Sequence, residues 1–221
     1  MQTNTNKTTK KIVGIALFSA LAYVVAFTCK LIPPVAGFLS LDAKDAVIAI
    51  ASFILGPICA PVIALIVATL ELLTFSTTGL YGFVMNFASS AVFSLTVSLI
   101  YKYRKSFTAA LLGFLSSVVA TTGVMLLLNI FVTPIYLRSI GVPNPDVISM
   151  LPGILLPFNF AKALLNSAVA LLLYKPLITA MRRAHLIEGG VHKTEFNKTT
   201  LLTVCIGVAA LTVGVVIVVL I

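Results

Sequence analysis

One segment in the last third of the chain carries polar side chains at a regular spacing inside an apolar run. The segment LPFNFAKALLNSAVALLLYKP covers residues 156–176, and within it Asn159, Lys162 and Asn166 stand at i, i+3 and i+7. This spacing places the three side chains on one face of a helix. Two amides and an ammonium group suit a largely neutral ligand with many hydrogen-bonding groups. We therefore predict a binding face here.

Two other apolar segments repeat this spacing. Their members are Thr122, Met125 and Asn129 in one segment, and Asn86, Ser89 and Phe93 in the other. Unpaired polar groups are costly in hydrocarbon, so each set is expected to face the interior of a helix bundle. Asparagines in membrane helices also serve as interhelical contacts. This alternative stays open for Asn129 and Asn159, and more strongly for Asn86 and Asn166.

The composition indicates an integral membrane protein. Of the 221 residues, 60% are hydrophobic and only 10% are charged. A soluble domain of this length needs more polar surface than that. The net charge of +9 comes from short basic clusters between apolar runs, a pattern typical of membrane topology signals and not of nucleic-acid binding. The three cysteines show no metal-ligand spacing.

The apolar runs predict an all-α fold with seven membrane segments. We expect helices at 12–31, 43–56, 57–75, 82–100, 107–136, 153–174 and 199–221. The run 45–75 is read as two helices divided at Gly56-Pro57, because only this division places all three basic clusters on one side of the membrane. The clusters lie at residues 7–11, 102–105 and 175–198. The N-terminus is then cytoplasmic. The second helix is short, about 20 Å, and must be tucked against its neighbours.

With this topology the polar side chains meet at one level of the membrane. At 1.5 Å per residue, Asn159 and Lys162 lie about 9 and 14 Å below the outer end of their helix. Asn129, Asn86 and Glu71 fall at a similar depth on other helices. We predict a cavity that opens outward. For Glu71, two other interpretations are an ion pair with Lys162 and snorkelling to the outer interface.

Two outer loops are candidates for covering that cavity. The loop 30–46 contains Pro33-Pro34 and Gly37, which prevent a helix, yet most of its other residues are apolar. Such a loop is expected to cover something. The turn-rich segment 138–151 is a candidate second lid, and a plain connector is the alternative for both loops.

The first helix carries small residues at close spacing. Ala16 and Ala20 stand four residues apart, and Ala22 and Ala26 repeat the interval. Small residues at this spacing allow close approach of another helix. The two interpretations are packing inside the bundle and docking to a partner membrane protein.

Four ordered segments together resemble the substrate-binding S-components of energy-coupling factor (ECF) vitamin transporters, and most of all the riboflavin-specific type. They are STTGLYGFVMNFASS (76–90), LIYKYRK (99–105), NIFVTPIYL (129–137) and LPFNFAKALLNSAVALLLYKP (156–176). The likeness covers roughly residues 10–180, and Pro-Phe-Asn-x-x-Lys is its most specific part.

The resemblance implies a six-helix bundle that captures a vitamin from outside the cell membrane and performs no chemistry. It implies that Asn129, Asn159 and Lys162 hold riboflavin, and that the loop around Phe38, Leu39, Leu41 and Asp42 closes over it. Asn86, Glu71 and Asn166 complete the predicted site. It also implies that Ala16 and Ala20 dock onto an EcfT-like membrane coupling subunit driven by two cytosolic ATPases. Riboflavin is then the transported ligand, and no permanent cofactor or metal is expected.

Two features depart from the family pattern. The helix 199–221 is an addition to the six, so the expected division is a tail (1–11), a binding domain (12–181), a basic linker (182–198) and an extra C-terminal membrane helix, with Ala210 and Gly214 available for packing. Glu71 has no counterpart in the pattern, which leaves the exact ligand open.

Other functions remain as alternatives. The first is an S-component for another vitamin or precursor. The second is an ion-coupled carrier that uses Glu71 and Lys162, although no inverted repeat is visible. An intramembrane enzyme is disfavoured, because both histidines fall in the linker and no catalytic motif lies within the predicted helices.

Overall fold

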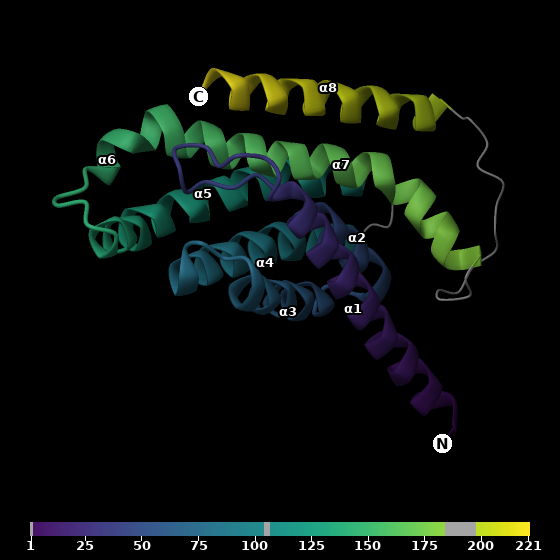
Figure 1. Cartoon of the computed structure of the whole chain (residues 1–221). Helices are drawn as coiled ribbons and strands as arrows, with labels where there is room; N and C mark the ends of the chain where they lie inside the picture. Colours follow the sequence, from purple (N-terminus) through teal and green to yellow (C-terminus); the bar gives the residue numbers. More distant parts are fainter. Residues whose placement is uncertain (1, 104–106, 184–197) are drawn as a thin grey trace.

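The computed structural model describes residues 2–103, 107–183 and 198–221, and Figure 1 shows that helices dominate these ranges. In chain order they are α1 (Gln2–Cys29), α2 (Lys44–Leu55), α3 (Cys59–Thr74), α4 (Gly79–Tyr103), α5 (Phe107–Ser139), α6 (Val147–Met150), the π-helical turn η1 (Leu151–Leu155), α7 (Leu156–Arg183) and α8 (Lys198–Leu220). The predicted all-α bundle is confirmed. The predicted linker falls mostly outside the described residues.

Five helical segments are long and apolar enough to cross a membrane by length and composition. They are Thr8–Cys29, Gly79–Tyr103, Thr108–Ser139, Val147–Tyr174 and Leu201–Leu220. Within the fourth, α6, η1 and α7 follow each other without a break, so the chain crosses there as one segment. α3 is a shorter apolar helix. The chain is therefore a multi-pass membrane protein.

α1 is longer than the sequence predicted. It begins at Gln2, ten residues before the expected start at 12, and it continues through the basic cluster at Lys10 and Lys11. No proline or glycine precedes Gly14, so nothing in this stretch interrupts the helix. The N-terminal end of α1 projects away from the other helices (Figure 1).

The division of the run 45–75 into two helices is confirmed. α2 ends at Leu55 and α3 begins at Cys59, with Gly56 at a φ of 98° between them. Few residues other than glycine adopt this left-handed backbone, which explains why the chain turns here. The turn lets α3 run back beside α2.

α2 forms the centre of the bundle. Its first nine residues, from Lys44 to Ser52, are all buried, and the helix contacts α1, α3, α4 and α7. One apolar cluster joins α1, α2 and α3 around Phe18, Ile48 and Ile63. A second joins α2, α4, α5 and α7 around Ile50 and Phe93. This short helix is thus enclosed by longer ones, as its length predicted.

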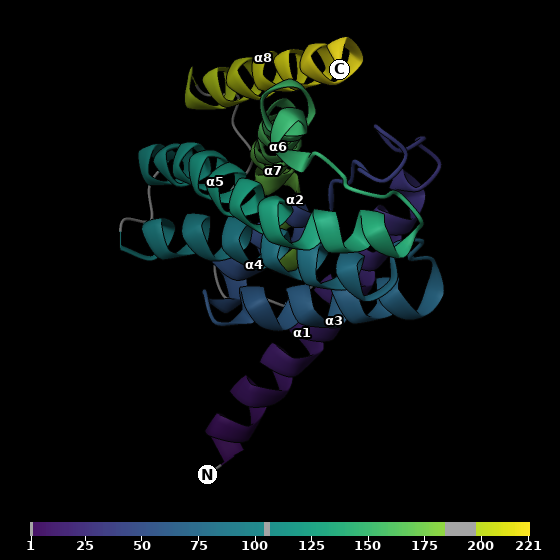
Figure 2. The same ribbon diagram turned by 90° about the vertical axis from the view of Figure 1, so that its left-hand side faces the viewer.

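α8 lies along α7 at the edge of the bundle, on the side opposite α1 (Figures 1 and 2). Its buried positions Thr203, Gly207 and Gly214 follow helical spacing and face α7. A methyl group added at Gly214 would stand 2.7 Å from Leu165 Cγ, so the two helices approach closely only because this side chain is absent. Gly207 meets Leu172 in the same way. The predicted packing position Gly214 is therefore in the contact, and Ala210 is half-buried.

Candidate functional site

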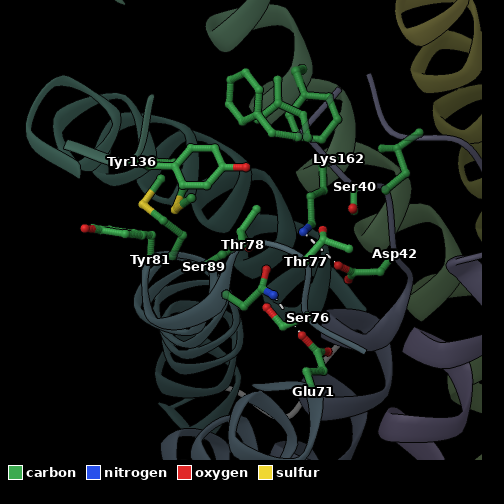
Figure 3. A pocket seen from close by; sticks show the side chains of 18 of the residues that line it. Ser40, Asp42, Glu71, Ser76, Thr77, Thr78, Tyr81, Ser89, Tyr136 and Lys162 are labelled. Carbon is green, nitrogen blue, oxygen red and sulfur yellow. Dashed lines mark hydrogen bonds and ion pairs between the residues drawn. The ribbon is translucent and has the colours of Figure 1, made fainter. Parts of the chain in front are cut away.

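A cavity lies at the end of the bundle where the loop before α2 returns to the helices. Its walls come from that loop and from α3, α4, α5 and α7. Eight predicted site residues line it: Phe38, Leu39, Leu41, Glu71, Asn86, Asn129, Asn159 and Lys162. The exposed residues Lys30 and Thr77 stand at its rim, so the cavity reaches the surface. Figure 3 shows Lys162 and Asp42 on one side, with Tyr81 and Tyr136 on the other.

Two asparagines of the cavity are held by their own helices. Asn159 Nδ2 donates to the backbone oxygen of Leu155 at 2.7 Å, and Asn129 Nδ2 donates to that of Met125 at 2.7 Å. Thr133 Oγ1 in turn donates to Asn129 Oδ1 at 2.7 Å. Both asparagines are almost completely buried, yet both line the cavity. Their amide groups are thus fixed in orientation before any ligand arrives.

Lys162 is paired with Asp42, and the sequence did not predict this partner. Lys162 Nζ lies 2.8 Å from Asp42 Oδ2, which ties α7 to the end of the loop (Figure 3). The pair between Lys162 and Glu71, one of the alternatives for Glu71, is therefore wrong. Because both ends of the Lys162–Asp42 pair are largely buried, a buried charge would be left without compensation if either were removed.

Glu71 pairs with Lys44 instead. Lys44 Nζ donates to the two carboxylate oxygens at 2.6 and 2.8 Å, and the Glu71 side chain is 5% exposed. Snorkelling to the interface is therefore also wrong. Lys44 Nζ stands 3.7 Å from Asp42 Oδ2, so four side chains of alternating sign run from α3 to α7. Their formal charges cancel, which favours a ligand without net charge.

Asp42 is the loop residue of this chain of charges. Burial alone raises the pKa of its carboxyl, but the Lys162 and Lys44 ammonium groups outweigh that effect and hold the pKa below its ordinary value. Asp42 therefore remains a carboxylate at neutral pH and holds the loop against α7.

Asn166 does not line the cavity. Its side chain is completely buried, accepts a hydrogen bond from the Ala46 backbone N–H at 2.9 Å and donates to the backbone oxygen of Asp42 at 2.8 Å. It also donates to the backbone oxygen of Lys162 at 3.0 Å. These contacts favour the interhelical alternative. Asn166 therefore holds the end of the loop at Asp42 and the start of α2 at Ala46 against α7.

The loop itself is a compact turn over the cavity. Val35 N–H donates to the backbone oxygen of Leu39 at 2.8 Å, and Ala36 and Gly37 between them have φ values of 51° and 80°. The turn directs the Phe38 ring toward Tyr136, with ring centroids 6.1 Å apart. The predicted covering role of this loop agrees with its placement. The segment 138–151 contributes no residue to the described lining.

Sequence reasoning missed several residues of the site. Asp42 was assigned only to the covering loop, and Lys44 was not assigned at all, yet both carry the charge network of the site. Their signal was present in the motif Asp-x-Lys-Asp at 42–45, where three charges stand within four residues of an otherwise apolar region. Thr133 and Tyr136 also line the cavity. They lie one and two helical turns from Asn129, and a wider search of that helix face would have included them.

The alanines of α1 divide between two sides of the helix. Ala22 and Ala26 are buried inside the bundle, whereas Ala16 and Ala20 are exposed on its outside. The packing interpretation therefore holds for Ala22 and Ala26, while docking stays a prediction for Ala16 and Ala20. The exposed pair leaves a shallow surface on which another helix can approach α1.

Comparison with known proteins agrees with this fold. Residues 10–174 match the family model described as "ECF transporter, substrate-specific component". The chain is 32% identical to the riboflavin transporter RibU of Staphylococcus aureus (strain TCH60) over 178 residues, which cover 79% of this chain and 93% of that protein. It is 27% identical to the riboflavin transporter FmnP of Bacillus subtilis (strain 168) over 186 residues, 80% and 98% of the two chains.

A solved structure of an ECF S component has a similar fold. The structure described as "Structure and mechanism of the S component of a bacterial ECF transporter" superimposes with a TM-score of 0.67 and 30% identity, and covers 80% of this chain and 99% of that one. The family match ends at residue 174, so α8 lies beyond it. The chain belongs to the ECF transporter substrate-specific components, the membrane subunits that bind the substrate of an ECF importer.

Proposed function

We propose that this chain captures riboflavin. The observation that carries the proposal is the convergence of Asn129, Asn159 and Lys162 on one cavity, in a chain similar to two riboflavin transporters. Riboflavin combines a flat, largely apolar ring system edged by acceptors and an imide N–H with a chain of hydroxyl groups. Side chains such as Phe38, Leu39 and Phe158 suit the ring, and the amides and Lys162 suit its polar edge.

The loop 30–43 is the proposed lid. Closing it over the ligand excludes water from the cavity, and a ligand that leaves the buried amides unpaired is then rejected strongly. The alternating charges of Glu71, Lys44, Asp42 and Lys162 supply no excess charge to the cavity, which is consistent with an uncharged vitamin.

A titration tests the ligand. The purified chain in detergent is mixed with riboflavin, and quenching of flavin fluorescence is followed. We expect binding at micromolar or lower concentration. A folded protein that does not bind riboflavin would contradict the flavin assignment and turn the search to another vitamin. Riboflavin uptake by vesicles that contain this chain alone, driven by a proton gradient, would instead favour the ion-coupled carrier.

The proposed partner surface is the exposed side of α1. Ala16 and Ala20 allow an EcfT-like coupling subunit, driven by two ATPases, to approach the helix closely. With Ala20→Leu we expect loss of co-purification with the coupling module and unchanged riboflavin binding. Leu21→Phe adds bulk at a neighbouring exposed position and is the matched control. Equal co-purification of both variants would contradict this surface.

The proposed orientation places the N-terminus in the cytoplasm, so that the cavity opens outward. A single cysteine introduced at Thr5 of a cysteine-free variant should react with a membrane-impermeant maleimide only after the cells are opened. Labelling of intact cells would reverse the orientation.

A further inference from the structure

Glu71 lines the inner wall of the cavity and bonds to one asparagine of the same wall. Asn86 Nδ2 on α4 donates to Glu71 Oε2 at 2.8 Å, while Lys44 on α2 donates to both carboxylate oxygens. Glu71 is 3% exposed, whereas Asn86 is half-buried and lines the cavity. The carboxylate thus lies beneath Asn86 and is held in place from a third helix.

This contact fixes which end of the Asn86 amide faces Glu71. An ionised carboxylate has only acceptor oxygens, so it accepts the amide N–H₂ and repels the amide oxygen. The carbonyl group is the other arm of the same planar amide, and no protein donor to Asn86 Oδ1 is found among the described hydrogen bonds. A reversed amide would place two acceptors face to face in a buried setting, which is costly.

We propose that Glu71 is a positioning residue that turns the carbonyl oxygen of Asn86 into the cavity, where it accepts a hydrogen bond from the ligand. Lys44 also holds the Glu71 carboxylate in place, because its ammonium group donates to both oxygens and compensates the buried charge. The wall formed by α4 is therefore selective for a ligand donor, an N–H or an O–H, at this position.

The inference rests on the proposed function, and riboflavin has few groups that could donate a hydrogen bond to Asn86. The oxidised vitamin has two kinds of donor, the imide N–H of the ring and the hydroxyl groups of the side chain. 3-Methylriboflavin lacks the first kind, and lumiflavin lacks the second. One of these two analogues is expected to lose the bond to Asn86, and the comparison identifies which.

The central experiment measures the affinities of riboflavin and both analogues for the wild type and for Asn86→Leu. Removing the carbonyl should weaken riboflavin binding about tenfold, the effect of one net hydrogen bond. The analogue that lacks the matching donor should bind both proteins with the same affinity. Met85→Leu, a neighbouring change in the cavity lining without hydrogen-bonding groups, is the control and should affect the three flavins alike.

The role of Glu71 is tested by Lys44→Met combined with Glu71→Gln. This double variant removes both charges together, and the new glutamine lets the Asn86 amide take either orientation. The expected result is the same analogue-dependent pattern as for Asn86→Leu, with a smaller loss for riboflavin. If Asn86→Leu does not fold, Asn86→Ser replaces it.

Two results would overturn the inference. One is equal weakening of all three flavins by Asn86→Leu, since a purely structural asparagine predicts no dependence on the analogue. The other is wild-type riboflavin affinity in the double variant, which would mean that Glu71 orients nothing. A wild type that is folded but binds no riboflavin contradicts the proposed function instead, so the two failures are distinguishable.

Discussion

The two ends of the bundle are built from different interactions. At the cavity end, buried carboxylates, ammonium groups and amides hold the loop 30–43, α3, α4 and α7 around an open space. At the other end, α2, α4, α5 and α7 meet through aromatic rings. Phe53 stands with its ring centroid 4.3 Å from that of Tyr101 and 5.7 Å from that of Tyr174, and the two tyrosine hydroxyls are 2.5 Å apart.

This difference indicates that the cavity end binds the ligand and that the aromatic end holds the helices together. Charged and amide groups have directional partners, so they leave room for a ligand that completes their hydrogen bonds. Rings packed against each other exclude water and small molecules by contact. One end is therefore expected to set affinity and the other to set the stability of the bundle. Four substitutions test that division, in order of decreasing effect.

The largest effect is expected for Lys162→Met. It removes a proposed ligand donor and leaves Asp42 with only the more distant Lys44, at 3.7 Å. Breaking a buried pair lowers the stability of the folded protein by about 3–5 kcal/mol. Loss of a charged donor to the ligand should also lower riboflavin affinity by roughly 10- to 100-fold in a fluorescence titration. The control is Lys30→Met at the rim, which should matter little. Equal losses for both variants would remove the special role of the buried pair.

Next comes Phe53→Ala at the aromatic end. Loss of a large ring from this cluster should lower the free energy of unfolding by about 3 kcal/mol, measured in detergent by thermal or chemical denaturation. The dissociation constant for riboflavin should stay unchanged in the folded protein. A large loss of affinity would show that the two ends are not separate.

A smaller effect is expected for Gly214→Leu in α8. The new side chain collides with Leu165 and pushes α8 from α7, at a cost of about 1–3 kcal/mol in stability. Ala209→Leu adds nearly the same bulk at an exposed position of α8 and should be neutral. If both variants unfold at the wild-type temperature, the close contact seen here contributes nothing.

The smallest effect is expected for Tyr101→Phe. It removes one hydroxyl of the tyrosine pair and leaves the ring contacts with Phe53 intact, so stability should fall by about 1 kcal/mol or less. Flavin affinity should not change. A loss larger than that of Phe53→Ala would mean that the hydroxyl pair, and not the rings, holds this end together.

The sequence predicted the helices better than the contacts between them. Apolar run length and the basic clusters were sufficient to divide α2 from α3 at Gly56 and to place Asn129, Asn159 and Lys162 at one level. The start of α1 was wrong because helices continue into polar residues when nothing interrupts them. The roles of the site residues stay predictions.

The sequence did not predict which charged side chains pair with each other. A pair between Lys162 and Glu71 was one alternative, since both were assigned to the same depth, but Lys162 pairs with Asp42 of the loop and Glu71 pairs with Lys44. Which cation meets which anion depends on how the turn at Val35–Leu39 leads the chain into α2, and such a turn has no periodic signature.

The complete enclosure of α2 constrains how the chain assembles in the membrane. Lys44 and Asp45 each oppose entry into lipid by about 3 kcal/mol, so this short helix has little reason to insert by itself during synthesis. Its backbone meets Asn166, more than a hundred residues later in the chain. The contacts at the centre of the bundle can therefore form only after α7 has emerged from the ribosome. Premature release of the nascent chain would leave Lys44 and Asp45 at the edge of the bilayer.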